Sequence, residues 1–288
     1  MEMFRINIEE PIFLRNLLIF PIKNGLENKG LSFENIDNVI GMKTGRFYEL
    51  ATPDVNNIVF DYNGNIPVLM IDGEEVTGSM QNRIIAQSFI AAPNVQNQIP
   101  VICAEENRWE EIGGFKTGYC SYPRVRSILA SSFNKKVDTQ REVWKEIERK
   151  LTVTRTKSRT SSMHEIFDNL NDEIERYLEG FEGLNHNTIG FIGVAGNQIL
   201  GCDIFCSPEI YQKFEKKLLR SYALDAIEYQ HNRGTKPDIE TFFKKILAVL
   251  NDEELKSKSG HKRIQGRKFF GQMVFHNKIA VHLSAFSN

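Results

Sequence analysis

The chain has 288 residues, 41% of them hydrophobic and 25% charged, and its net charge is −1 at neutral pH. This composition is typical of a soluble globular protein with a substantial core, and so small a net charge excludes nucleic-acid binding driven by overall charge. The sequence has no run of about 18 apolar residues to span a bilayer, and no apolar signal segment at its N-terminus. We therefore expect a cytoplasmic protein with neither nucleic acid nor a membrane as its partner.

The cysteines and histidines follow no metal-binding pattern. The four cysteines are Cys103, Cys120, Cys202 and Cys206, and they form no CxxC pair. The six histidines form no HxH or HxxxH pattern. We therefore expect free thiols and no zinc site.

The first 130 residues contain short apolar segments separated by turn residues, which is typical of strands. The expected strands are Ile12–Pro21, Phe47–Leu50, Ile58–Tyr62, Ile66–Ile71, Arg83–Ala92 and Ile99–Cys103. Asn63-Gly64-Asn65 separates two of them and is a strong hairpin signal. This spacing predicts an N-terminal antiparallel β-rich sheet or sandwich.

Helices and two further β-hairpins are expected in the rest of the chain. Helical periodicity is expected around Val143–Leu151, from a capping box at Ser162–Glu165 to Phe181, from Pro208 to about Gln230, and over Pro237–Leu250. The expected hairpins join Ile189–Val194 to Gln198–Phe205 and Phe269–Phe275 to Ile279–Phe286. Blocks of strands, then helices, then strands predict one compact α+β domain over residues 1–288, with a β-rich part to about 130 and a mixed helical part from about 131.

The segment Asp72–Arg83 carries more polar side chains than a turn between two strands needs. Glu74 and Glu75 are adjacent, so in an extended chain they point to opposite sides. Two carboxylates near one ligand can act as acid and base or hold a divalent cation. The alternative is a solvated acidic turn.

The same segment ends in Gln81-Asn82-Arg83, which offers amide donors and a guanidinium group. This combination suits the binding of a phosphate or a carboxylate. On a polar turn, Arg83 would contribute little to stability and much to anion binding, so Arg83→Ala should abolish binding and leave the fold intact. The alternative is that these side chains cap the backbone at a strand edge.

A second polar segment, Cys103–Glu110, also follows an apolar strand. Glu105 is a further candidate catalytic carboxylate. Arg108 and Trp109 set a cation beside a flat ring, as in sites for nucleotides, although such pairs also form ordinary surface contacts. We expect the two polar segments to line one pocket.

In the helix expected after Pro208, Asp225 falls within an apolar stripe that includes Tyr222. A buried carboxylate is costly unless it is paired, so we expect a partner, with Arg83 or Arg108 the leading candidates. Asp225 is therefore a candidate catalytic residue and Tyr222 a candidate ligand-binding residue. The alternative for Asp225 is a purely structural ion pair.

Four segments, in this order, resemble the ADP-ribosylglycohydrolase- and rhodanese-phosphatase-associated protein family. They are Pro67–Glu75 with Gln81–Arg83, Ile99–Trp109, Arg220–Ala226 and Val281–Phe286. The resemblance runs from about residue 12 to 286. Members of the family usually have a small residue and a lysine before Gln-Asn-Arg, where this chain has Ser79-Met80.

The resemblance implies a protein that binds or processes an NAD-derived, ADP-ribose-like nucleotide, in prokaryotic NAD metabolism or anti-phage defence. ADP-ribose-processing enzymes are the implied protein partners. As an enzyme it would be a hydrolase in which Glu75 or Glu105 activates water and Arg83 or Arg108 stabilises negative charge. The sequence identifies no cofactor, although a divalent cation is compatible with the carboxylates. The alternatives are a non-catalytic protein that sequesters the ligand and a structural partner of a neighbouring enzyme.

Overall fold

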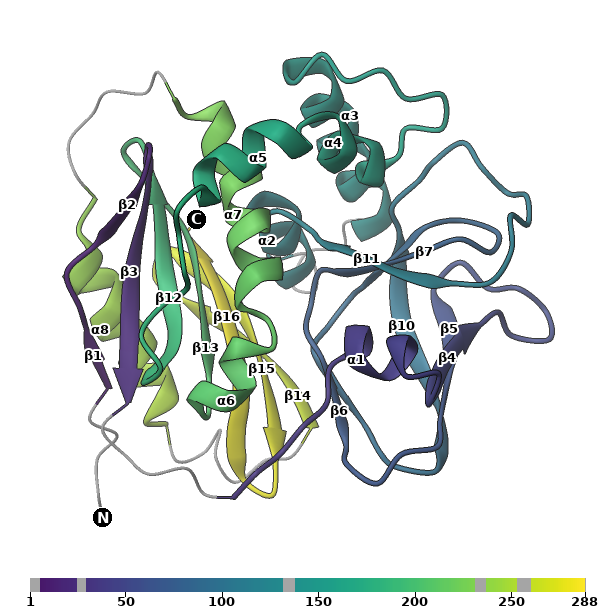
Figure 1. Ribbon diagram of the computed structural model, residues 1–288, viewed down its shortest axis with the longest axis horizontal. Coiled ribbons are helices and arrows are strands. Elements are labelled where there is room, and N and C mark those ends of the chain that lie inside the picture. Colours follow the sequence, from purple (N-terminus) through teal and green to yellow (C-terminus); the bar gives the residue numbers. More distant parts are fainter. Residues whose placement is uncertain (1–5, 25–29, 132–137, 231–236, 253–259, 288) are drawn as a thin grey trace. The chain divides into compact units, whose positions relative to one another are not determined.

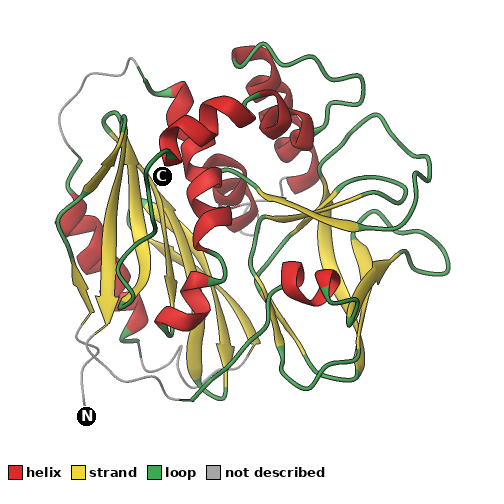
Figure 2. Ribbon diagram, in the orientation of Figure 1, coloured by secondary structure: helices red, strands yellow, loops and turns green. Residues whose placement is uncertain are grey.

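The computed structural model describes residues 6–24, 30–131, 138–230, 237–252 and 260–287. Its antiparallel sheets and separate helices confirm the predicted α+β class (Figures 1 and 2). The chain forms two compact units. The central unit is Ser32–Asn171, and the flanking unit combines Met1–Leu31 with Asp172–Asn288.

The boundaries between the units do not fall where the composition changes. The sequence indicates a change near residue 130, whereas the units separate at 31/32 and at 171/172. The physical reason is strand pairing, because β3 (Leu17–Asn24) pairs with β12 (Thr188–Ala195) and joins the first strands to the C-terminal sheet. That the whole chain acts as one domain stays a prediction.

The flanking unit contains an eight-stranded antiparallel sheet with the order β1-β3-β12-β13-β16-β15-β14, in which β2 also pairs with β3. Its further strands are β1 (Ile6–Ile8), β2 (Ile12–Leu14), β13 (Gln198–Phe205), β14 (Gly260–Gly266), β15 (Phe269–His276) and β16 (Ile279–Ser287). Its helices are α5 (Asn171–Leu178), which begins at the last residue of the central unit, α6 (Pro208–Gln212), α7 (Glu215–Glu228) and α8 (Ile239–Leu250).

Helices cover both faces of this sheet, because alternate residues of each strand point to opposite sides. On one face, Ile192 packs in a core cluster with Ile246 of α8. On the other face, the rings of Phe191 and Tyr222 have centroids 4.8 Å apart. A Cβ at Gly193 would lie 2.3 Å from the Tyr222 ring, so glycine allows α7 to approach β12 closely.

The central unit contains a six-stranded sheet of order β11-β7-β8-β10-β5-β4 and a two-stranded sheet of β6 and β9. The strands are β4 (Gly45–Tyr48), β5 (Asn57–Tyr62), β6 (Val68–Met70), β7 (Glu74–Thr77), β8 (Arg83–Ile85), β9 (Phe89–Ala91), β10 (Val95–Cys103) and β11 (Lys116–Cys120). The helices are α1 (Ile36–Gly41), α2 (Pro123–Ser131), α3 (Thr139–Val153) and α4 (Met163–Asn169).

The two predicted hairpins of the flanking unit are confirmed as β12–β13 and β15–β16. The hairpin predicted at Asn63-Gly64-Asn65 is wrong. The strand β5 pairs instead with β4 and β10, while β6 pairs with β9. The Tyr62 hydroxyl donates to the carbonyl of Ile66 (2.8 Å) across the bend, so non-local pairing overrides the local turn signal.

Four expected elements are each divided. The strand expected over Ile12–Pro21 gives β2 and β3, which pair with each other. The segment Arg83–Ala92 gives two strands in different sheets. The helix expected to run from the capping box to Phe181 is interrupted at Leu170. The helix expected from Pro208 is interrupted near Lys213. The amides of Lys213 and Phe214 there donate to carbonyls three residues earlier, which is the tighter turn found at helix ends.

Candidate functional site

The first polar segment is not a connection between strands. Glu74–Thr77 is the strand β7, which lies between β8 and β11 in the six-stranded sheet. As a result Asp72, Glu74, Glu75 and Arg83 are fully buried. A solvated acidic turn is therefore the wrong interpretation, and each of these charged groups needs a partner inside the protein.

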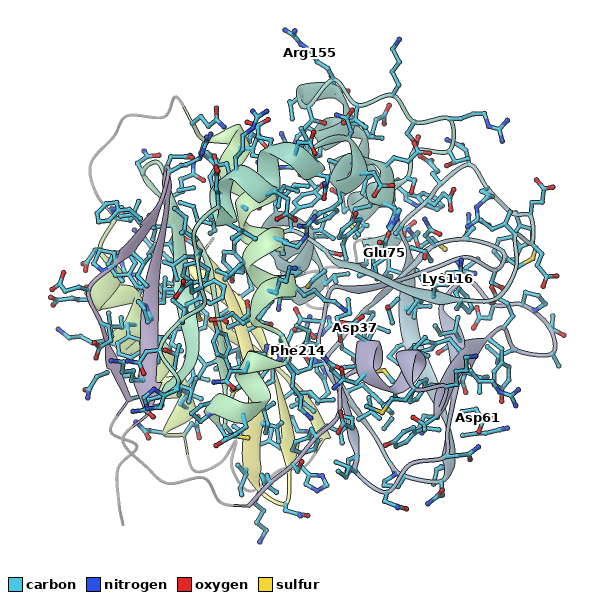
Figure 3. The ribbon with its side chains drawn as sticks, viewed as in Figure 1. Asp37, Asp61, Glu75, Lys116, Arg155 and Phe214 are labelled. Atoms are coloured by element: carbon cyan, nitrogen blue, oxygen red, sulfur yellow. The ribbon has the colours of Figure 1, made fainter. Side chains whose placement is uncertain are left out.

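Glu75 meets a histidine that the sequence did not identify. Its Oε2 lies 2.7 Å from Nδ1 of His164 on α4, and the amide of Tyr119 on β11 donates to the same oxygen at 3.3 Å. A Cβ at Gly118 would lie 2.4 Å from Oε2, so glycine leaves room for the carboxylate. Figure 3 shows Glu75 beside β7 and β11. Among the described residues, Oε1 of Glu75 has no hydrogen-bond partner.

The surroundings of His164 favour its protonated form. Burial acts to lower the pKa of His164, but the hydrogen bond and charge of Glu75, with smaller contributions from Asp168 and Glu105, outweigh it and raise that pKa above its ordinary value. Its Nε2 lies 3.8 Å from Asp168 Oδ2, and its side chain is 30% exposed. The Tyr119 hydroxyl donates to Asp168 Oδ1 at 2.8 Å.

Asp72 and Glu74 occupy a different environment. The guanidinium of Arg126 on α2 lies 3.2 Å from Asp72, and both side chains are fully buried. Ser88 donates to the second oxygen of Asp72 at 2.9 Å. Glu74 accepts from the amide of Ile71 at 2.9 Å. These bonds assign both acids to internal stabilisation, and the sequence offered no signal for Arg126 because it lies 54 residues from Asp72.

Glu105 and Arg108 hold the second polar segment in place. Burial acts to raise the pKa of Glu105, but hydrogen bonds from Arg108, Thr160 and the amide of Asn82 lower it overall. The Arg108 guanidinium donates to Glu105 (2.8 Å) and to the carbonyls of Ser79 (2.6 Å), Gly78 and Glu110. Arg108 thus has a full set of internal acceptors.

Arg83 is also engaged inside the unit, and the prediction that it lies on a polar turn is wrong. Its guanidinium donates to Gln81 (2.9 Å) and contacts the Cys103 thiol, and it lies 3.7 Å from Glu49. It also stands over the ring of Trp109, 5.4 Å from the centroid. The two polar segments therefore meet as expected, with Trp109 remaining 49% exposed. That they line a ligand pocket stays a prediction.

The two amides join the segments to the start of α4. Gln81 donates to the carbonyl of Glu105 at 2.8 Å. Asn82 donates to the hydroxyl of Ser162 at 3.3 Å. Ser162 is the N-cap residue of α4, as predicted, but its side chain makes no capping bond. Through this pairing the start of α4 is fixed next to β8, which places His164 near Glu75.

In the flanking unit, Tyr222 belongs to a buried polar network. Its hydroxyl donates to Asp203 Oδ2 at 2.9 Å, and Asp203 Oδ1 lies 3.0 Å from Nε2 of His282. Tyr222 and His282 come from two of the four segments on which the family resemblance rests. Asp225 is 2% exposed, which agrees with its place on an apolar face, and its pairing with Arg83 or Arg108 stays a prediction.

The Glu75–His164 pair is the group with the clearest chemical capacity. A buried carboxylate that orients a partly exposed imidazole is the arrangement of a general acid or base. Within the described ranges, no three His, Cys, Asp or Glu side chains are grouped to hold a metal ion. No helix in the described part of the chain is both long and apolar enough to cross a bilayer.

Comparison with known proteins identifies the family. The model of the ARG and Rhodanese-Phosphatase-superfamily-associated Protein domain (ARPP-1) matches residues 5–286. Searches of curated proteins and of solved structures found no match. The family match covers nearly the whole chain, including both compact units. The chain therefore belongs to the ARG and rhodanese-phosphatase-superfamily-associated protein family.

Proposed function

We propose that this protein binds and hydrolyses an NAD-derived, ADP-ribose-like nucleotide, with the Glu75–His164 pair as its acid–base group. The observation that carries the proposal is the 2.7 Å contact between a fully buried carboxylate and a half-buried imidazole. The family name supplies the link to ADP-ribosylglycohydrolases and hence to the class of ligand. The setting would be NAD metabolism or anti-phage defence.

In this mechanism His164 exchanges protons through Nε2, because Nδ1 faces Glu75. In its neutral form, Nε2 takes a proton from the attacking water while Glu75 stabilises the resulting imidazolium. The protonated form can then return the proton to the leaving group. The exposed ring of Trp109 offers a flat surface for a base or nicotinamide.

The test is to incubate the protein with ADP-ribose, NAD and cyclic ADP-ribose, with and without Mg²⁺, and to separate the products. His164→Gln should reduce turnover by about 10²–10⁴-fold, the usual contribution of a positioned acid or base. His186→Gln is the matched control, because His186 is exposed and lies in the flanking unit. Equal activity of the two variants, or no product from the parent protein, would refute the acid–base role.

A second candidate is a non-catalytic protein that sequesters the ligand, and the internal bonds of Arg83 and Arg108 favour it. The sequence suggested both guanidinium groups for stabilising charge in a reaction. Arg108 donates to Glu105 and Ser79, and Arg83 donates from Nη1 to Gln81, while Nε and Nη2 of Arg83 have no hydrogen-bond partner among the described residues. This reading predicts a thermal shift with ADP-ribose and no product. Neither product nor shift would favour a structural partner of an ADP-ribose-processing enzyme.

A further inference from the structure

A basic hollow lies at the end of α3 in the central unit. It has a volume of about 580 Å³ and is lined by the last turns of α3 and by the loop that follows. This volume is in the range of small-molecule sites, although the hollow is widely open to solvent and not enclosed. The lining residues are Glu148, Leu151, Thr152, Arg155, Thr156, Lys157, Ser158 and Arg159.

The loop exposes its three cations. Arg155, Lys157 and Arg159 occupy alternate positions and are exposed, while Thr156 between them is buried. None of the three cations forms an ion pair with another described residue. Figure 3 shows Arg155 pointing away from the body of its unit.

Hydrogen bonds to neighbouring segments fix the position of the loop. Asn169 at the end of α4 donates to the Thr156 hydroxyl at 3.0 Å. The Ser158 hydroxyl accepts from the amide of Ser162 at 2.8 Å, and Thr160 donates to Glu105 at 2.6 Å. The cations are therefore carried on a backbone that is already ordered, which reduces the entropy lost when a ligand binds.

Arg155 occupies a position that favours glycine. The amide of Thr156 bonds to the carbonyl of Leu151, and that of Arg155 bonds to Thr152, which is the pattern of a Schellman helix end. Arg155 has φ = 54° at the position where this motif usually has glycine. This backbone conformation costs stability, and it also occurs at other described cations such as Lys43 and Lys278.

We propose that this hollow binds the pyrophosphate group of a small phosphorylated metabolite. Three cations against the single carboxylate of Glu148 leave a net charge of about +2 on the lining, which complements two phosphates. The three cations lie within five consecutive residues of the loop, so they can approach one pyrophosphate group. Pyrophosphate binding in the hollow requires no turnover at His164.

The same loop leads directly into the candidate site. After Arg159 the chain pairs with the second polar segment at Glu105 and Ser162, and α4 then begins. A metabolite whose pyrophosphate is held by the loop would therefore be anchored in the unit that carries His164. For an ADP-ribose-like nucleotide, the hollow would be its phosphate subsite, and this extension alone rests on the proposed function.

The test is calorimetric titration of the full chain with inorganic pyrophosphate. The variant Arg155→Gln/Lys157→Gln/Arg159→Gln should bind at least tenfold more weakly than the parent. The control Lys43→Gln/Lys116→Gln/Arg141→Gln removes the same charge from exposed positions of the same unit and should bind within twofold of the parent. No binding by the parent, an equal loss in both variants or no loss in the first variant would overturn the proposal.

Two more variants separate this site from folding and from catalysis. Arg155→Gly should raise the melting temperature, because glycine accepts the positive φ, while it weakens pyrophosphate binding. Unchanged binding would remove Arg155 from the site. His164→Gln should bind pyrophosphate as the parent does, and a matching loss would place the phosphate at His164 instead. Pyrophosphate binding without ADP-ribose hydrolysis would keep the hollow and refute the proposed function.

Discussion

Each unit contains one buried carboxylate in contact with a histidine, and the two pairs differ in access to solvent. Glu75 lies 2.7 Å from His164 in the central unit, and Asp203 lies 3.0 Å from His282 in the flanking unit. Both carboxylates are fully buried. The side chain of His164 is 30% exposed, whereas that of His282 is not exposed. Of these two imidazoles, only that of His164 can therefore reach a dissolved ligand.

The second oxygen of each carboxylate shows the same contrast. Asp203 accepts a further hydrogen bond from Tyr222, which connects β13 to α7. The Oε1 of Glu75 is buried without a hydrogen-bond partner among the described residues. A satisfied buried network stabilises one packing arrangement, while an unsatisfied acceptor is a feature that functional sites retain. The Asp203–His282 pair is therefore structural, and the Glu75–His164 pair is the better candidate for the proposed chemistry.

The largest expected effect is on the stability of the flanking unit. Asp203→Ala removes the acceptor for both Tyr222 and His282, and we expect a loss of roughly 3–5 kcal/mol in the free energy of unfolding. Urea denaturation measures it. Glu175→Ala, which breaks a more exposed pair with Arg220 in the same unit, is the control and should cost less than about 1 kcal/mol. Equal losses would contradict the contrast between buried and accessible pairs.

Arg83→Ala should also destabilise the protein, in contrast to the expectation from sequence that only binding would be lost. The guanidinium is fully buried and contacts Gln81, Cys103 and Glu49, so its removal leaves a cavity and a carboxylate without a cation. We expect a loss of about 3 kcal/mol. Arg46→Ala, whose side chain is 75% exposed, is the control. A stable Arg83→Ala protein that binds no nucleotide would restore the original prediction.

The sequence predicted the meeting of the two polar segments from a sheet shared by the strands before them, but those strands, β6 and β10, lie in different sheets. The segments meet because Arg83, at the end of the first segment, begins β8, which pairs with β10. Arg83 and Cys103 are direct register partners on β8 and β10. The sequence did not predict that Arg83 is buried, because the polar residues of β7 are typical of a connection between strands. Because Glu74 and Glu75 are polar, the sequence does not indicate a strand here. The pairing of β7 with β8 and β11 establishes it.

His164 could not be found from local patterns. It lies 89 residues from Glu75, and it belongs to no recognisable histidine motif. The nearest signal was the predicted N-cap at Ser162, which located the start of its helix. The link between this helix and β8 is a hydrogen bond from Asn82 to Ser162. A side-chain contact between residues 80 positions apart produces no periodic pattern in the sequence.

The pH dependence of His164 protonation provides a smaller but more specific test of the Glu75–His164 contact. Because Glu75 helps to raise the pKa of His164, Glu75→Gln should lower that pKa, as measured by the chemical shifts of the imidazole protons in an NMR titration. A raised pKa in the folded state stabilises the protein below the unfolded value of about 6.5, and this contribution is lost as pH rises through the folded pKa. Stability of the parent should therefore fall across that interval, and the fall should be smaller in Glu75→Gln.

An unchanged His164 titration in Glu75→Gln would show that the carboxylate does not control the imidazole.

The smallest expected effect comes from two matched tyrosine hydroxyls. Tyr119 donates to Asp168 at 2.8 Å in a partly exposed setting, and Tyr222 donates to Asp203 at 2.9 Å in a buried one. Tyr119→Phe keeps the stacking of its ring on Phe167, whose centroid is 4.5 Å away, and water can replace the lost bond. We expect a loss of less than about 0.5 kcal/mol for Tyr119→Phe and of about 1.5–3 kcal/mol for Tyr222→Phe, because the latter leaves a buried charged acceptor short of a donor. Urea denaturation of both variants measures the difference. If the two losses are equal, solvent access does not distinguish the two carboxylate–histidine pairs, and the preference for Glu75–His164 as the reactive pair loses its physical basis.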